Sequence, residues 1–121
     1  MTGVFAWLGV GVAGAAGTAV RFLIHEAAGR RAGRAYGTLF VNVSGSLVLG
    51  ILVGATLDGG AYRILGTGFL GAYTTFSTWM LETHRLTDER GPVGGWANIV
   101  VSLVLGLAAA VIGRHLGAAL S

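Results

Sequence analysis

The stretch GAYTTFSTW, residues 71–79, lies in the middle of a run, 64–81, that carries no charged side chain. A helix of about 20 apolar residues crosses the ~30 Å hydrocarbon layer of a membrane. The stretch nevertheless holds four serine and threonine residues, which compete for backbone hydrogen bonds and weaken a regular helix. We predict that this membrane helix is broken near its centre. The alternative is a kinked helix whose hydroxyl groups bond back to the preceding turn.

Three more uncharged runs surround this one, at residues 1–20, 35–57 and 91–113. Only 11% of the 121 residues are charged, against roughly 25% in soluble domains. We therefore predict an all-α membrane protein with one domain, 1–121, and four transmembrane helices. Their expected ranges are 4–27, 36–57, 61–84 and 92–116, with Pro92 opening the last helix. The first ten residues contain no basic side chain, so we expect a permanent helix there rather than a signal peptide.

Glycine contributes 22 residues, mostly inside the predicted helices. In a membrane, small residues four apart allow two helix backbones to approach closely. The chain has such pairs at Gly50 and Gly54, at Ser102 and Gly106, and at Gly113 and Gly117. They indicate tight helix packing and are compatible with an oligomer.

Positive charge is concentrated in the predicted loops and comes entirely from eight arginines. Arginines in loops between apolar runs set the orientation in the membrane, so we expect no nucleic-acid partner. Five arginines fall on one side of the predicted bundle and two on the other. This imbalance favours a cytoplasmic location for the richer side and an outside location for both termini. The five are Arg30, Arg31, Arg34, Arg85 and Arg90, and the two are Arg63 and Arg114.

Polar side chains recur along one face of two helices. Thr38, Asn42 and Ser46 are four residues apart, as are Asn98, Ser102 and Gly106. Such stripes mark either hydrogen bonds between helices or a polar path across the membrane. With the hydroxyl-rich third segment, they favour a path, and the absence of mid-membrane acids argues against a proton-coupled carrier.

Aromatic and charged residues near the third segment raise further hypotheses. Phe76 and Trp79 can share a face and point their positive ring edges at an anion, although simple packing explains them too. Arg21 either reaches the headgroups or lines an anion-attracting vestibule, and Glu82 can pair with Arg85. A serine hydrolase would need a base within reach of Ser77, and His84 lies two helical turns away near the membrane edge, so we do not expect an enzyme.

The sequence resembles the small fluoride channels known as Fluc or CrcB proteins. The resemblance rests on GAAGTAVRF (14–22), GTLFVNVSGS (37–46), GFLGAYTTFSTWMLE (68–82) and NIVVSLVLGL (98–107), which follow the family's order and spacing. It implies passive, fluoride-selective export through two pores of an antiparallel dimer in the plasma membrane. It also implies a central structural sodium ion, held by the backbone carbonyls of Gly71 and Thr74 from both subunits.

The resemblance also assigns roles to single residues. The pore-lining positions of the family fall on Asn42, Phe76, Trp79 and Ser102, and we add Thr38 and Ser77 to them. Arg21 and Glu82 would belong to the vestibule. Family members carry phenylalanine where this chain has Trp79, whose indole is bulkier and adds an N–H donor.

Two other classes of membrane protein share features with this sequence. Small multidrug-resistance-type transporters are also four-helix antiparallel dimers, but they depend on an acid buried in helix one, and residues 1–20 contain none. A non-transporting assembly protein would leave the hydroxyl-rich stretch without a purpose.

A protein inserting in both orientations should have balanced loop charges. We therefore hypothesise a fixed orientation, with a homologous second subunit as one possible partner.

Overall fold

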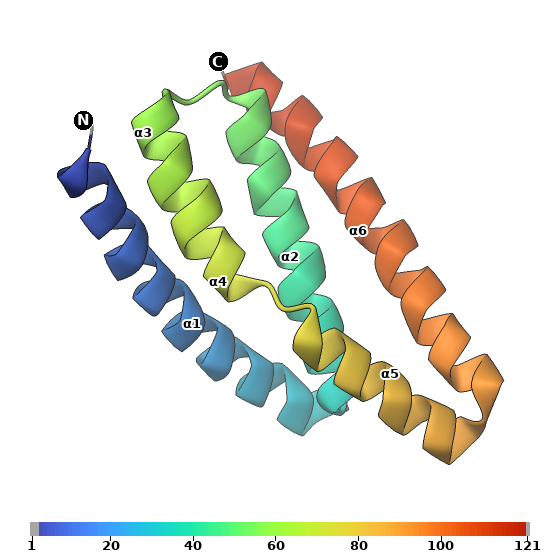
Figure 1. Ribbon diagram of the computed structural model, residues 1–121. Helices are drawn as coiled ribbons and strands as arrows, with labels where there is room; N and C mark the ends of the chain where they lie inside the picture. The colour runs from blue at the N-terminus through green and yellow to red at the C-terminus, as the bar shows by residue number, and fades with distance from the viewer. Residues whose placement is uncertain (1–2, 121) are drawn as a thin grey trace.

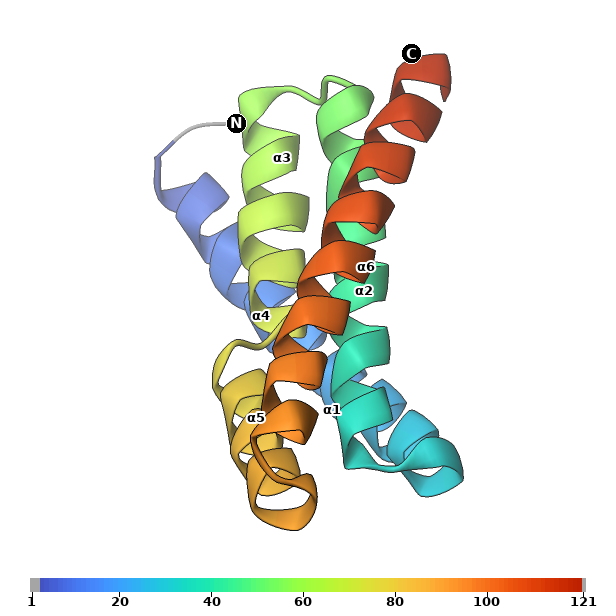
Figure 2. The same ribbon diagram turned by 90° about the vertical axis from the view of Figure 1, so that its right-hand side faces the viewer.

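Every regular element in the described part of the chain, residues 3–120, is a helix. The computed structural model contains α1 (Val4–Ala32), α2 (Arg34–Gly54), α3 (Gly59–Tyr62), a π-helical segment η1 (Arg63–Leu70), α4 (Gly71–Tyr73), α5 (Ser77–Arg90) and α6 (Pro92–Leu120). These elements form four passes along one axis, with the third pass built from α3, η1, α4 and α5 (Figures 1 and 2). The predicted all-α membrane fold with four helical passes is confirmed.

Three of the passes are single helices that are long and apolar enough to cross a membrane, namely α1, α2 and α6. The third pass is divided, as the hydroxyl-rich stretch predicted. Its backbone leaves the helix at Thr74, where φ is −80° and ψ is 160°, and becomes helical again at Ser77. Thr74 Oγ1 donates to the Leu70 carbonyl at 3.0 Å. The hydroxyl bond to the preceding turn, which the alternative of a kinked helix predicted, is therefore also present, just before the break.

The ends of the helices differ from the predicted ranges for local reasons. α1 runs on to Ala32, because Gly33, at φ +102°, reverses the chain within one residue before α2 starts. α3 starts after Asp58, whose Oδ1 accepts a hydrogen bond from the Ala61 amide at 2.9 Å. Pro92 opens α6 as predicted, directly after Gly91 at φ +79°.

Close backbone contact joins α2 to α6, which lie side by side in both views (Figures 1 and 2). Four glycines, two on each helix, have no room for a Cβ because backbone atoms of the opposite helix occupy its place. They are Gly50 against Ala110, Gly54 against Arg114, Gly113 against Leu47, and Gly117 against Ile51. The glycine pairs noted in the sequence therefore form an interface within the chain.

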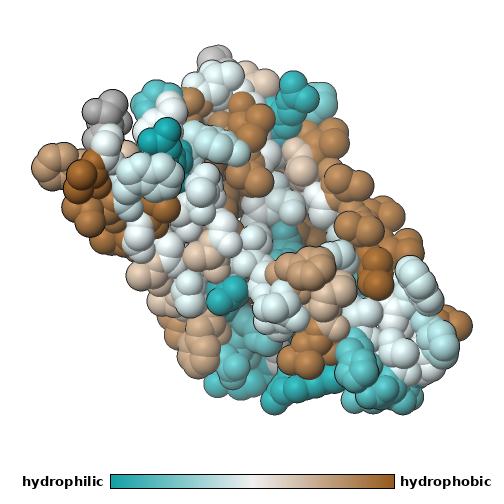
Figure 3. All heavy atoms as spheres, viewed as in Figure 1, coloured by the Kyte–Doolittle hydropathy of each residue, from teal (hydrophilic) through white to brown (hydrophobic). Residues whose placement is uncertain are grey.

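Large apolar side chains cover much of the outside of the bundle, which Figure 3 shows as brown areas along α6 and at the start of α1. Phe5 and Val93, for example, are 75% and 80% exposed. A soluble protein rarely exposes contiguous apolar surface on this scale. This surface matches a surrounding of lipid or of further membrane helices.

We predict that Gly113→Ala destabilises the chain by about 1–3 kcal/mol, because the added methyl group forces α6 away from the α2 backbone at Leu47. Thermal unfolding in detergent measures the change. Gly11→Ala is the matched control, since nothing lies within 4 Å of the Cβ it adds. Equal unfolding temperatures of the two variants would contradict the close-contact role of Gly113.

Candidate functional site

The break in the third pass is bridged by one side chain of α2. The amide of Asn42 donates from Nδ2 to the Thr75 carbonyl at 2.9 Å, and its Oδ1 accepts from the Thr75 amide at 2.8 Å. A single residue therefore satisfies both backbone groups of Thr75, which an uninterrupted helix would have paired internally. The sequence singled out Asn42 as a pore residue but gave no sign of this backbone bridge.

The Thr75 side chain starts the next helix. Its Oγ1 accepts a hydrogen bond from the Thr78 amide at 3.2 Å, which is the geometry of a helix N-cap. Ser77 Oγ lies 3.5 Å from the same oxygen. Thr75 is 92% buried, with 8% of its surface exposed, so this cap operates away from water.

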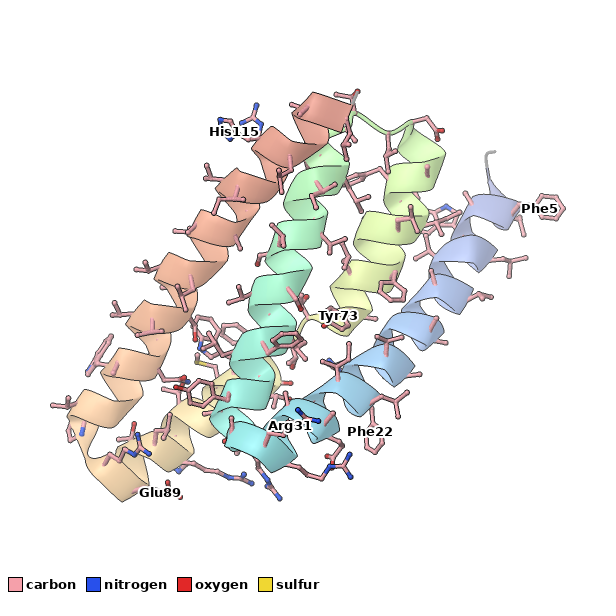
Figure 4. The ribbon with its side chains drawn as sticks, turned by 180° about the vertical axis from the view of Figure 1, so that it is seen from behind. Phe5, Phe22, Arg31, Tyr73, Glu89 and His115 are labelled. Carbon is pink, nitrogen blue, oxygen red and sulfur yellow. The ribbon has the colours of Figure 1, made fainter. Side chains whose placement is uncertain are left out.

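Thr74, the residue before Thr75, contacts α1 through its carbonyl group. Arg21 Nη1 donates to the Thr74 carbonyl over a long 3.4 Å. Tyr73, one residue further back, packs in the core with Val41 and Leu70, and its hydroxyl lies 2.9 Å from Ser44 Oγ. Figure 4 shows Tyr73 about midway between the two ends of the bundle. Contacts to α1 and α2 thus hold the chain in place on the α4 side of the break.

A groove of about 430 Å³ runs beside the break, between α2, α6 and the third pass. It gathers six of the residues predicted from the sequence, together with Ser46 and Thr75 as further polar lining. The six are Asn42, Gly71, Thr74, Phe76, Trp79 and Ser102. Neutral hydrogen-bonding groups and aromatic rings therefore line the same groove between α2, α6 and the third pass.

Thr38 and Ser77, which the sequence predicted as pore residues, lie outside this groove. Thr38 is only 1% exposed, and its hydroxyl lies 3.0 Å from Nε2 of His25 on α1. This contact makes Thr38 part of the α1–α2 packing and separates it from the groove lining. Ser77 is exposed at the start of α5 and does not line the groove either.

A second cavity, of about 610 Å³, lies among α2, α5 and α6 near the turn between α5 and α6. Glu82 and three arginines line it: Arg34, Arg85 and Arg90. Glu82 is buried and accepts a hydrogen bond from Arg85 Nη1 at 3.3 Å, so the predicted pair is present. Arg21 does not line this cavity. The two predicted vestibule residues are therefore not brought together.

The arginine-rich loops gather at one end of the bundle, as the sequence predicted. Figure 4 shows Arg31 and Glu89 at this end and His115 at the opposite one, and Figure 3 shows the corresponding teal surface. Both described ends of the chain lie at the opposite end, near the connection between α2 and α3 (Figure 1).

Oxygen donors for a sodium ion are present at the break. Because the Thr75 amide bonds to Asn42, the Gly71 carbonyl loses the donor that a continuous helix would give it. The Thr74 carbonyl has only the long contact to Arg21 and keeps a free lone pair. Hard cations prefer such backbone oxygens, so Gly71 and Thr74 fit a cation, and an ion held there would need further oxygen ligands.

The aromatic pair of the groove has a defined arrangement. The rings of Phe76 and Trp79 meet edge to face, with centroids 5.8 Å apart and planes at 85°. Phe76 is 71% exposed in the single chain. The Trp79 Nε1 atom is enclosed and has no hydrogen-bond acceptor among residues 3–120.

The fold and site define a class: a small four-helix membrane protein with a polar groove beside an interrupted helix. The family model described as CrcB-like protein, Camphor Resistance (CrcB), matches residues 8–114. The chain belongs to this family, in agreement with the resemblance noted in the sequence.

Curated relatives match over nearly their full length. A protein of Mycobacterium tuberculosis named fluoride-specific ion channel FluC 2 is 54% identical over 89% of this chain and 87% of its own. The protein of that name from Mycolicibacterium paratuberculosis is 53% identical over 96% and 97%. Fluoride-specific ion channel FluC 1 of Symbiobacterium thermophilum is 44% identical over 92% and 96%.

We predict that Asn42→Asp destabilises the chain by about 1–3 kcal/mol, because the carboxylate cannot donate to the Thr75 carbonyl and repels it instead. Thermal unfolding in detergent and hydrogen exchange at the Thr75 and Thr78 amides measure the loss.

Asn98→Asp is the control for this experiment, since the partner of Asn98 is the hydroxyl of Thr83, which can rotate from the Trp79 carbonyl to donate to the new carboxylate. If Asn42→Asp and Asn98→Asp had equal effects on both measurements, the bridging role of Asn42 would be refuted.

Proposed function

We propose that this chain is a subunit of a fluoride-selective ion channel that lets fluoride leave the cytoplasm passively. The observation that carries the proposal is the groove beside the interrupted helix, in a chain whose curated relatives are named fluoride-specific ion channels. Fluoride is small and strongly hydrated, so its passage needs donors that replace water without holding the ion too tightly. Asn42, Ser102 and the aromatic ring edges supply neutral groups of this kind.

The single chain supports a dimer as the conducting unit. Phe76 is largely exposed beside the groove, and in a dimer a second chain would cover it in place of lipid. An antiparallel pair would create two equivalent grooves and hence two pores. The partner is either a second copy of this chain or a homologous subunit.

A central sodium ion fits the same arrangement. In an antiparallel pair, the carbonyls of Gly71 and Thr74 from each chain would supply four oxygen ligands. The ion would have a structural role, because it would join the two interrupted helices and neutralise the carbonyl oxygens that face each other across the pair.

We predict that liposomes containing only this purified chain release fluoride rapidly and retain chloride, because the groove offers hydrogen-bond donors without a fixed charge. A fluoride electrode and a chloride electrode follow the two ions in parallel. Protein-free liposomes are the control. No fluoride release from verified dimers of this chain would exclude the homodimeric channel, and no release after adding a homologous subunit would exclude the function.

Charge asymmetry between the ends favours one orientation in the plasma membrane, with the arginine-rich loops in the cytoplasm and both termini outside. We predict that reporters fused to the C-terminus are found almost entirely outside. Exchanging Arg30, Arg31 and Arg34 for glutamine should lower this fraction, because it reduces the excess of positive charge. Equal populations on both sides for the unaltered chain would contradict a fixed orientation.

A further inference from the structure

The second cavity lies apart from the groove, at the arginine-rich end of the bundle. Its volume of about 610 Å³ falls within the range of about 300–1,000 Å³ that is typical of small-molecule sites. The starts of α2 and α6 and the second half of α5 form it, and among residues 3–120 it shares no lining residue with the groove. Figure 4 marks this end of the bundle with the labels Arg31 and Glu89. Because the membrane-spanning helices α2 and α6 begin here, the cavity lies at the level of the lipid headgroups.

The ionisable side chains of the cavity leave it with a positive charge. Three arginines and two glutamates line it, namely Arg34, Arg85, Arg90, Glu82 and Glu89, so one positive charge is not balanced. Glu82 and Arg85 pair with each other at 3.3 Å. The guanidinium groups of Arg34 and Arg90 have no hydrogen-bond acceptor and no ion pair among residues 3–120. Two arginine side chains are therefore available to an anion that enters the cavity.

The chemistry of these groups suits a phosphate. The planar guanidinium group donates two parallel hydrogen bonds to phosphate oxygens. The start of α2 adds positive potential on the same side, because Gly33 provides no side-chain cap for it. A phosphodiester carries one negative charge, which cancels the net charge of the lining, whereas a zwitterionic headgroup would leave that charge in place.

The same cavity also has an apolar side, which indicates that the phosphate belongs to a lipid. Leu39 of α2, Leu86 of α5 and Val101 of α6 contribute to it. Val101 follows Pro92 by nine residues, or about 14 Å along α6, so the lining reaches from the headgroup level into the hydrocarbon layer. A water-soluble phosphate compound would leave this apolar side uncovered, whereas an acyl chain attached to the phosphate would cover it.

We propose that this cavity binds an anionic phospholipid with a single phosphodiester, of which phosphatidylglycerol is the simplest probe. Arg34 and Arg90 donate to the phosphate, and an acyl chain lies along the apolar side. In the orientation proposed above, the cavity faces the cytoplasmic leaflet, where anionic lipids produce a negative surface potential. The bound lipid would connect the ends of α2, α5 and α6, and it would stabilise the folded chain because it binds that state alone. This lipid site goes beyond the proposed channel function.

The first test compares lipids on the purified chain in detergent by native mass spectrometry. From an equal mixture of phosphatidylglycerol and phosphatidylcholine with the same acyl chains, the chain should retain phosphatidylglycerol about tenfold more often. Equal retention of the two lipids would overturn the proposal. Glycerophosphoglycerol, which is the same headgroup without acyl chains, should not displace the lipid at equal concentration. If it did, the cavity would be a site for soluble phosphate compounds, and the proposed lipid site would be wrong.

The second test removes the two free arginines. Arg34→Gln combined with Arg90→Gln should lower the apparent affinity for phosphatidylglycerol about tenfold or more, because two charged contacts to the phosphate are lost. Arg63→Gln combined with Arg114→Gln is the matched control, since it removes the same charge at the opposite end of the bundle and should leave the affinity unchanged. Equal losses in both double variants would show a general effect of surface charge and would refute the site. Neither test measures fluoride transport, so the lipid site and the channel function stand or fall separately.

Discussion

The two hydrogen bonds between the Asn42 amide and the backbone of Thr75 allow a helix to stop in the middle of a membrane and start again. Lipid offers no partner for free N–H and C=O groups, so an interrupted helix needs a protein group, water or a bound ion at each one. An asparagine amide carries a donor and an acceptor on neighbouring atoms, in the spacing that a peptide group presents. With this bridge in place, the chain can open a polar groove beside Phe76 and Trp79 without leaving Thr75 unsatisfied.

The bridge depends in turn on a rigid frame around it. α2 carries Asn42, and its glycine contacts with α6 set the distance between these two helices. The π-helical segment η1 and the Tyr73–Ser44 contact fix the approach of the chain to the break from the other side. Close backbone packing is an effective source of stability here, because lipid provides little hydrophobic drive for one helix to join another.

The sequence predicted the four passes, the position of the break and the arginine-rich end, because these depend on hydrophobicity, hydroxyl content and charge along the chain. It also named six of the residues that line the groove. It did not predict that Asn42 pairs with Thr75, or that Thr38 pairs with His25, because both pairs join separate helices. A polar stripe shows which face of a helix is polar, but the rotation and depth of the neighbouring helix decide which of its members meet the groove and which lie in the packing.

Under the proposed function, the groove would carry an anion past backbone oxygens that would hold a cation. The break frees the carbonyl oxygens of Gly71 and Thr74 from helical pairing, and the amide nitrogen of Asn42 keeps a second N–H besides the one that donates to Thr75. The backbone oxygens belong to the interrupted segment and the side-chain donor to α2, so they need not compete for the same ion. Arg21 brings a fixed positive charge to the break through its contact with the Thr74 carbonyl. Because the donors of the groove itself are neutral, an anion there would be stabilised by several weak contacts rather than trapped by one strong charge.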